Sequence, residues 1–198
     1  MTEPSLLTDE HEHHSISKVL RDWVLVVILA LSAALLVRVY VLQQFYISGP
    51  SMETTLLGDN RVLVNKMSYR LHSIHRGDVV VFDRVTTSDG TVAHDDLIKR
   101  VIAVQNDVIE IKNCVVFVNT KKIDEPYLNK DDLKAATASD RCRVVDMPAQ
   151  KIPAKKIFVM GDNRPDSFDS RSFGPISEDL VVGRAFAIVW PLNRLASL

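Results

Sequence analysis

The sequence predicts a mainly β protein with a single transmembrane helix at its N-terminus. Two observations lead to this fold class: residues 23–37 carry no charge, and the later segments are short, rich in Val and Ile, and separated by turn-forming residues. Apolar residues make up 46% of the chain and charged residues 25%, which excludes a disordered chain. Because 24 Lys and Arg balance 25 Asp and Glu, no nucleic-acid partner is expected.

The apolar stretch continues beyond Arg38 to Leu42, and its length fits a membrane span. A helix rises about 1.5 Å per residue, so residues 23–42 cover about 30 Å, the thickness of the hydrocarbon core. A buried core helix is the alternative, but apolar side chains on every face favour lipid. A cleaved signal peptide would need a basic leader, whereas residues 1–18 are acidic. We therefore expect a disordered acidic leader over 1–18, a retained anchor over 19–42, and the lipid bilayer as a partner.

Basic residues on the two sides of the anchor predict its orientation. Lys18 and Arg21 precede the span, whereas Arg61 and Lys66 follow it at a distance. The positive-inside rule slightly favours a cytoplasmic N-terminus of a single-pass protein.

No cofactor or metal is expected from the sequence. It shows no phosphate-binding loop and no dinucleotide fingerprint. Three leader histidines are expected to belong to a solvated polar tail rather than to a metal site: His11, His13 and His14.

Seven β segments are expected after the anchor, each bounded by turn signals. They cover residues 61–66, 78–84, 96–104, 107–111, 114–119, 157–160 and 184–190. This spacing is typical of an all-β sandwich or barrel. Hairpin turns are expected at Lys112-Asn113 and from Asn119-Thr120.

The stretch from about residue 123 to 153 is more polar and is expected to be an insertion between β elements. Its one helical period lies around 131–136. If this part lies outside the cytosol, Cys114 and Cys142 can form a disulfide worth about 3–4 kcal/mol on the chain-entropy model. Two unpaired thiols are the equal alternative.

Two stretches carry a candidate nucleophile and a candidate base. In the run SGPSMETTL, Gly49-Pro50 forces a tight turn that presents Ser51, although most turn serines only bond the backbone. In the run LIKRVIA, strand alternation puts Lys99 on an apolar face, where an ammonium tends to shed its proton. The apolar residues on that face are Leu97, Val101 and Ala103. Arg100 has equally apolar neighbours, so a lysine that reaches out to solvent remains the alternative.

A third stretch, 161–174, reads GDNRPDSFDSRSFG and is too polar for a core strand. Taken alone, it is expected to be a solvated loop held by Asx turns and ion pairs. His72, His75 and His94 lie in no catalytic motif, and no G-x-S-x-G elbow surrounds Ser51. What remains is a serine that needs a base and a lysine in apolar surroundings, the Ser-Lys variant of the catalytic triad.

Four motifs, in this order, resemble those of bacterial type I signal peptidases, which are membrane-anchored serine proteases with a Ser-Lys dyad. They are SGPSM at 48–52, RGDVVVF at 76–82, KRVIAV at 99–104 and GDNRPDSFDSRSFG at 161–174. The resemblance covers nearly all the chain except the leader and the insertion. It implies a coiled antiparallel β-sheet catalytic domain in two parts, 43–111 and 157–198, separated by a smaller inserted, non-catalytic β region over 112–156.

The resemblance also implies roles for individual residues. Ser51 would be the nucleophile, its backbone N–H would hold the oxyanion, and Lys99 would be the general base. Ser167 would hydrogen-bond the lysine amine and orient it. A supporting ionic framework would fix the polar loop against the strand of Lys99: Asp162, Arg164, Asp169 and Arg171. Three residues would line shallow substrate pockets, although ordinary core packing explains them nearly as well: Phe45, Ile47 and Ile98.

The implied substrates are signal peptides of exported preproteins, cut after a small-x-small pattern on the outer face of the cytoplasmic membrane, near the secretion translocon. Ser51 follows Leu42 by nine residues, so its oxygen should stay close to the bilayer.

Two other functions fit parts of the sequence. A self-cleaving repressor would share the Ser-Lys pair but would need a DNA-binding domain where the apolar span lies. A catalytically silent scaffold that binds exported chains would not need Ser51, Lys99 and Ser167 together.

Overall fold

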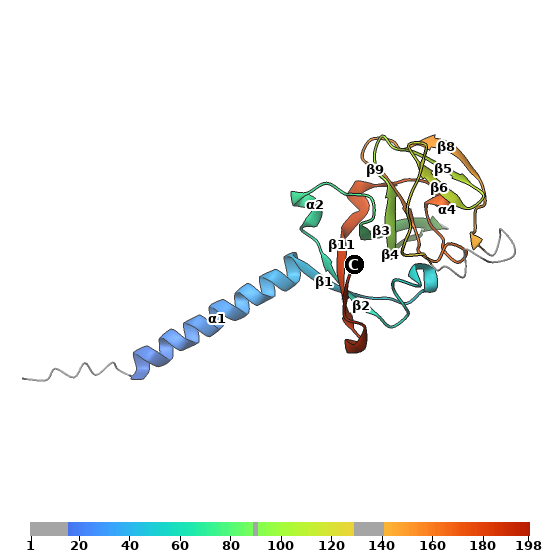
Figure 1. The fold of residues 1–198 in the computed structure, drawn as a ribbon. Helices are drawn as coiled ribbons and strands as arrows, with labels where there is room; N and C mark the ends of the chain where they lie inside the picture. The colour runs from blue at the N-terminus through green and yellow to red at the C-terminus, as the bar shows by residue number, and fades with distance from the viewer. Residues whose placement is uncertain (1–15, 89–90, 129–140) are drawn as a thin grey trace, which may run out of the picture. The chain divides into compact units, whose positions relative to one another are not determined.

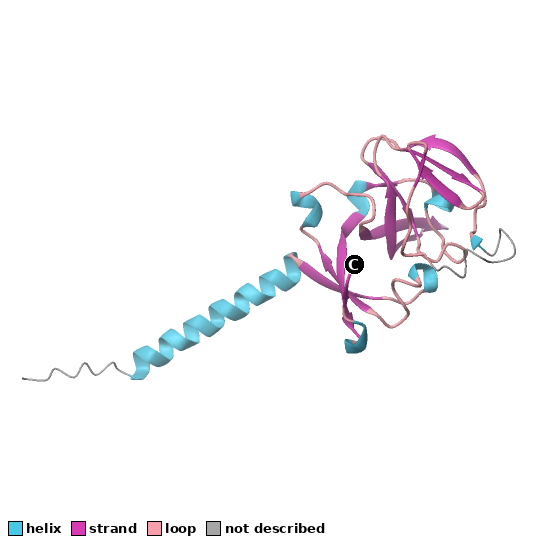
Figure 2. Cartoon of the chain, in the orientation of Figure 1, coloured by secondary structure: helices cyan, strands magenta, loops and turns pink. Residues whose placement is uncertain are grey.

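The computed structural model describes residues 16–88, 91–128 and 141–198 (Figures 1 and 2). The chain divides into two compact units, one helical and one built mainly of strands, with the boundary after Val39. The acidic part of the leader with its three histidines, and the helical period expected around 131–136, lie outside the described residues.

The N-terminal unit is formed by the helix α1 (Ile16–Tyr40), which is drawn in blue in Figure 1. Its segment Lys18–Arg38 has a mean hydropathy of 2.2 and no buried residue, so by length and composition it can cross a membrane. Trp23, for example, is 66% exposed. The helix ends at Tyr40, slightly before the expected end of the anchor, because Leu42 already belongs to a strand.

The second unit is built around an eight-stranded antiparallel sheet. Its strands are β1 (Leu42–Tyr46), β2 (Arg61–Asn65), β3 (Val79–Ser88), β4 (Thr91–Ala103), β9 (Lys156–Met160), β10 (Ile176–Ser177), β11 (Val181–Trp190) and β12 (Ala196–Ser197). They lie in the order β1-β2-β11-β3-β4-β9-β10, and β12 pairs with β11. β3 and β4 are longer than expected because they form a long hairpin. Its pairing runs from Val79 opposite Arg100 to Ser88 opposite Thr91.

Both faces of β3 are buried from Val79 to Phe82, which explains the uninterrupted apolar run there. Val79 and Val81 pack into one core cluster with residues of β2 and β11. Val80 and Phe82 pack into another cluster with residues of β4 and β9. Successive side chains of a strand point to opposite faces, so a strand covered on both sides needs apolar residues at every position. The centre of the sheet therefore lies inside the protein.

A second, four-stranded sheet has the order β7-β6-β5-β8 and forms the inserted region. Its strands are β5 (Val108–Lys112), β6 (Val115–Val118), β7 (Lys121–Lys122) and β8 (Met147–Lys151). Two-residue turns at Asn113-Cys114 and Asn119-Thr120 close its hairpins, and all four residues have positive φ, as type I′ turns require. The first turn lies one residue later than expected. β5 pairs with β6 and with β8, so this sheet begins at Val108.

Cys114 and Cys142 form a disulfide, with 5.8 Å between their Cα atoms. The sequence left a bridge and two free thiols as equal alternatives, and the structure has the bridge. It joins the β5–β6 turn to the segment that precedes β8, and so closes the chain between them into a loop.

Short helices occupy the connections of the second unit. They are η1 (Pro50–Met52), α2 (Ser68–Leu71), α4 (Ser170–Phe173), η3 (Glu178–Leu180) and η4 (Leu192–Arg194). Two of them hold candidate site residues, because Ser51 lies in η1 and Asp169 caps the N-terminus of α4.

Candidate active site

Ser51 lies in the 3-10 turn η1, which the loop after β9 holds in place. The Asn163 backbone N–H donates to the Ser51 carbonyl at 3.1 Å, and its side-chain amide donates to the Pro50 carbonyl at 3.1 Å. A Cβ atom on Gly161 would lie 2.3 Å from the Ser51 carbonyl oxygen and 2.3 Å from Ser167 Oγ. Only glycine fits this close approach, so the GDNR motif positions the backbone of the candidate nucleophile.

Lys99 reaches Ser51 from β4. Its Nζ donates to Ser51 Oγ at 2.7 Å and to the Ile98 carbonyl at 2.9 Å. The lysine is only 3% exposed, which rejects the alternative of a side chain that reaches out to solvent. Leu97 and Val101 pack into the core cluster around Val80 and Phe82, as strand alternation predicts. The third predicted neighbour, Ala103, packs in a different cluster, because a register shift interrupts β4 after Val101.

The surroundings of Lys99 make its ammonium group easier to deprotonate. Burial lowers the pKa of Lys99 from its ordinary 10.5 to about 8. The carboxylates of Asp169 and Asp162 oppose this effect, and the guanidinium of Arg171 adds to it. An uncharged amine within hydrogen-bond distance of a hydroxyl can accept its proton, which is the requirement for a general base.

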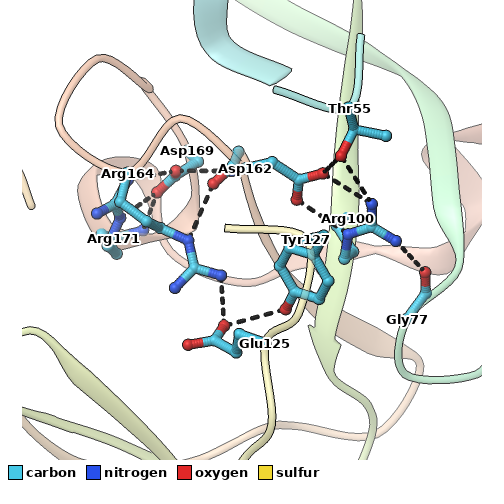
Figure 3. A network of polar contacts seen from close by, with 10 residues as sticks. Thr55, Gly77, Arg100, Glu125, Tyr127, Asp162, Arg164, Asp169 and Arg171 are labelled. Atoms are coloured by element: carbon cyan, nitrogen blue, oxygen red, sulfur yellow. Dashed lines mark hydrogen bonds and ion pairs between the residues drawn. The ribbon is translucent and has the colours of Figure 1, made fainter. Parts of the chain in front are cut away.

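Asp162 ties the polar loop to the strand of Lys99 (Figure 3). Arg100 donates to both carboxylate oxygens of Asp162, at 2.9 and 2.7 Å, and also to the Gly77 carbonyl at 2.9 Å. Thr55 Oγ1 donates to Asp162 Oδ2 at 2.5 Å. One carboxylate therefore joins the strand of Lys99 to the segment that follows Ser51.

Asp169 and Arg171 form a second, fully buried ion pair. Arg171 donates through Nε and Nη2 to the two oxygens of Asp169, at 2.8 and 2.7 Å, and the side chains of Arg171 and Asp169 are 1% and 0% exposed. The Gly161 N–H donates to Asp169 Oδ2 at 3.0 Å. Burial would raise the pKa of Asp169, but Arg171 and this N–H more than offset it, and the pKa is lowered. The pair therefore fixes the start of the polar loop beside Ser51.

Arg164, the fourth expected framework residue, pairs outside the polar loop. Its Nη2 binds the Glu125 carboxylate, and its Nε donates to the Gly161 carbonyl at 3.0 Å. Neither Glu125 nor Arg100 was singled out from the sequence as a framework partner. The sequence offered only an indirect indication, the four charged framework residues in one loop. A buried charge needs a partner, but the loop sequence does not say which residues elsewhere in the chain supply it.

Ser167 is buried beside the dyad but does not make the expected bond. Its hydroxyl lies against Gly161 and is 1% exposed, yet it forms no hydrogen bond with Lys99. The lysine instead uses Ile98 as its second acceptor. The orienting role of Ser167 stays a prediction.

The three expected pocket residues lie in one core cluster. Ile47 is buried there, and Phe45 and Ile98 pack against the cluster from partly exposed positions. The cluster also contains Met52, the residue after Ser51, so these side chains lie near the candidate nucleophile. Within residues 16–88, 91–128 and 141–198, no group of three or more His, Cys, Asp or Glu is placed to hold a metal ion.

Comparison with known proteins gives one consistent family. A family model described as "Signal peptidase, peptidase S26" matches residues 20–190. The chain is 36% identical to signal peptidase IB of Staphylococcus aureus (strain Mu50 / ATCC 700699) over 184 residues, which cover 89% of this chain and 93% of that protein. It is also 36% identical to signal peptidase I P of Bacillus subtilis subsp. natto over 175 residues, which cover 88% of this chain and 91% of the relative.

A solved structure is also similar, that of a signal peptidase I from Enterococcus faecalis V583. It has 23% identity and a TM-score of 0.43, and the match covers 57% of this chain and 97% of that one. The family model and the two relatives confirm the resemblance drawn from the four motifs. The chain belongs to the signal peptidase family of S26 peptidases.

Proposed function

We propose that this chain is a membrane-anchored serine endopeptidase that removes N-terminal signal peptides from exported preproteins through a Ser51–Lys99 dyad. The observation that carries the proposal is the buried contact of 2.7 Å between Lys99 Nζ and Ser51 Oγ. Family membership supports the substrate class, and α1 is long and apolar enough to serve as the anchor.

The proposed reaction has two steps. Neutral Lys99 takes the proton of Ser51 as the serine oxygen attacks the scissile carbonyl, and the Ser51 N–H donates to the resulting oxyanion. When the peptide C–N bond breaks, the Lys99 ammonium returns the proton to the leaving amine, and an acyl-enzyme ester remains. Lys99 then takes a proton from water as the water oxygen attacks the ester carbonyl. When the ester C–O bond breaks, the Lys99 ammonium returns this proton to Ser51 Oγ, and the cleaved peptide leaves with a new C-terminal carboxyl group. No cofactor is needed for either step.

The proposed enzyme would select substrates with small side chains by steric exclusion. Phe45, Ile47 and Ile98 lie in the cluster that contains Met52, where a shallow apolar pocket would reject large side chains. Ser51 follows the apolar segment closely in the chain, so a peptide bond near the end of a membrane-held segment is the target within reach. We further propose that the domain acts on the outer face of the cytoplasmic membrane, near the translocon.

Activity should depend on the ionisation of Lys99. Below its pKa of about 8 the amine is protonated and cannot accept the Ser51 proton, so kcat/KM should fall as the pH falls through this value. The measurement is kcat/KM for a model preprotein from about pH 6 to about pH 10. If kcat/KM instead falls near the ordinary lysine pKa, or does not change with pH, Lys99 is not the base.

Cleavage of a model preprotein tests the function itself. The full chain in detergent micelles should trim the precursor at one bond after a small-x-small sequence, and Ser51→Ala should lose about 10³-fold or more of the rate. The matched control is Ser73→Ala, a serine exposed in the loop after α2. If the precursor stays intact, a catalytically silent scaffold explains the chain better than a peptidase. If the protein cleaves its own chain instead, the self-cleaving class is favoured. Retained turnover in Ser51→Ala would remove the dyad.

A further inference from the structure

The segment from Glu125 to Tyr127 joins the inserted region to the polar framework of the site (Figure 3). The Glu125 carboxylate forms an ion pair with Arg164, and the two side chains are only 11% and 5% exposed. The Tyr127 hydroxyl donates to Glu125 Oε1 at 3.0 Å. A region expected to be non-catalytic thus supplies one carboxylate and one aromatic ring to the framework beside Ser51 and Lys99.

The Tyr127 ring contacts two guanidinium groups of the framework. The Arg100 Cζ atom lies 4.1 Å from the ring centroid, and the Arg164 Cζ atom lies 5.9 Å from it. The negative face of an aromatic ring attracts cations, and the attraction grows where water is excluded. Arg100 follows Lys99 directly in β4 and holds Asp162, so the ring helps to fix the strand that carries the base.

The same segment binds the turn that carries the nucleophile. Thr54 Oγ1 donates to the backbone carbonyl of Tyr127 at 3.0 Å. Its neighbour Thr55 donates to Asp162, which Arg100 holds. One short segment therefore contacts the continuation of the Ser51 turn on one side and the continuation of the Lys99 strand on the other.

Glu125 supplies the charge that balances a buried arginine. Burial alone would lower the pKa of Arg164, but the Glu125 carboxylate offsets this, and the pKa stands above its ordinary value. Arg164 donates to the Gly161 carbonyl, and Gly161 packs directly against the Ser51 carbonyl. Loss of the Glu125 charge would leave an unpaired buried cation two contacts away from the nucleophile.

We propose that Glu125 and Tyr127 are positioning residues for the Ser51–Lys99 pair. They act through three neighbours: Arg100, Arg164 and Thr54. Both also lie within the loop that the Cys114–Cys142 disulfide closes. The inference rests on the proposed function, because it concerns the rate of the chemical step at that same site. It gives the inserted region a part in catalysis rather than only in folding.

The test compares two variants of Tyr127 in the full chain, with kcat expressed per active site titrated by a serine-directed covalent probe. Tyr127→Leu keeps apolar bulk but removes the ring, so kcat should fall about tenfold to a hundredfold, as small misplacements of reacting groups do, while KM stays unchanged. Tyr127→Phe keeps the ring over Arg100 and should recover most of the lost kcat. A purely structural role would lower the melting temperature without changing kcat per titrated site.

A control and a second variant complete the design. Phe117 is a half-buried aromatic residue of β6, and its ring has a different cation beside it, Lys112. Phe117→Leu should therefore keep the wild-type kcat. Glu125→Gln retains the shape of the side chain but removes its charge, and it should lower kcat in the same way as Tyr127→Leu.

The outcomes separate the inference from the proposed function. If the wild-type chain does not cleave the preprotein, the proposed function fails. If the wild type cleaves the preprotein and both Tyr127→Leu and Glu125→Gln have the same kcat as the wild type, the positioning role is wrong. It is also wrong if Phe117→Leu loses as much as Tyr127→Leu, since general loosening of the small sheet would then explain the effect. Should Tyr127→Leu fail to fold, Glu125→Gln and Tyr127→Phe still decide the question.

Discussion

Replacing Lys99 with methionine is expected to abolish preprotein cleavage and at the same time to stabilise the fold at neutral pH. Methionine matches the length and bulk of the lysine stem but has no basic nitrogen, so Ser51 loses the group that takes its proton. The expected loss in kcat is about 10³-fold or more, comparable with that of Ser51→Ala. The measurement is single-turnover cleavage of the model preprotein, with circular dichroism to verify the fold.

The gain in stability follows from the sign of the pKa shift. The pKa of Lys99 is about 8 in the folded protein, below the ordinary value of 10.5 in the unfolded chain. Below about pH 8 the amine is charged in both states, and folding carries the cost of burying that charge. The cost disappears as the pH rises from about 8 towards 10.5.

At pH 7, Lys99→Met should therefore raise the free energy of unfolding by about 1–3 kcal/mol, after allowance for the lost hydrogen bonds to Ser51 and Ile98. Urea unfolding in micelles at about pH 7 and about pH 10 measures the difference between variant and wild type. The gap should shrink at the higher pH. If the variant is less stable than the wild type at pH 7, or if the difference in stability does not change with pH, then burial of the charged Lys99 amine does not destabilise the fold.

Breaking the Asp169–Arg171 pair from one side is expected to cause the largest loss of stability. Both side chains are buried, so Asp169→Asn leaves the Arg171 guanidinium without its counter-charge in a dry environment. Removing one partner of a buried ion pair costs about 3–5 kcal/mol. Because Asp169 also accepts from the Gly161 N–H, the Ser51 turn should loosen and cleavage should fall with it.

Two companion variants test the cause of this loss. Asp166→Asn removes a carboxylate from an exposed position of the same loop and should change stability by no more than about 0.5 kcal/mol. The double variant Asp169→Asn/Arg171→Met removes both charges and should regain part of the stability lost by Asp169→Asn. If the double variant is as unstable as the sum of both single changes, the unpaired charge is not the reason for the loss.

Local patterns in the sequence were enough to predict the N-terminal apolar helix and seven of the strands. The run from Trp23 is apolar on all sides, and the segments that became β2, β3, β4, β5, β6, β9 and β11 are long enough to show their apolar pattern. β7, β10 and β12 have two residues each, too few to show alternation. The sheet to which β5 belongs could not be read from its own sequence either, because the partner of a strand is chosen by tertiary pairing.

The candidate site divides in the same way. Ser51 and Lys99 were assigned through the resemblance of the four motifs, because the local pattern alone singles out neither of them, and the structure places them in contact. Arg100, Glu125 and Tyr127 were missed because their significance lies in contacts with residues distant in the sequence. Burial of several charges in one loop predicts that partners exist, but only the folded chain identifies them.

The protonation of Lys99 can be observed by a nuclear magnetic resonance titration of the chain labelled with ¹³C at lysine Cε, with Lys99→Met to assign the signal. One lysine, missing from the variant, should titrate at a pH of about 8. If every lysine signal instead titrates near the ordinary value of 10.5, the amine beside Ser51 is charged at working pH and cannot serve as the base.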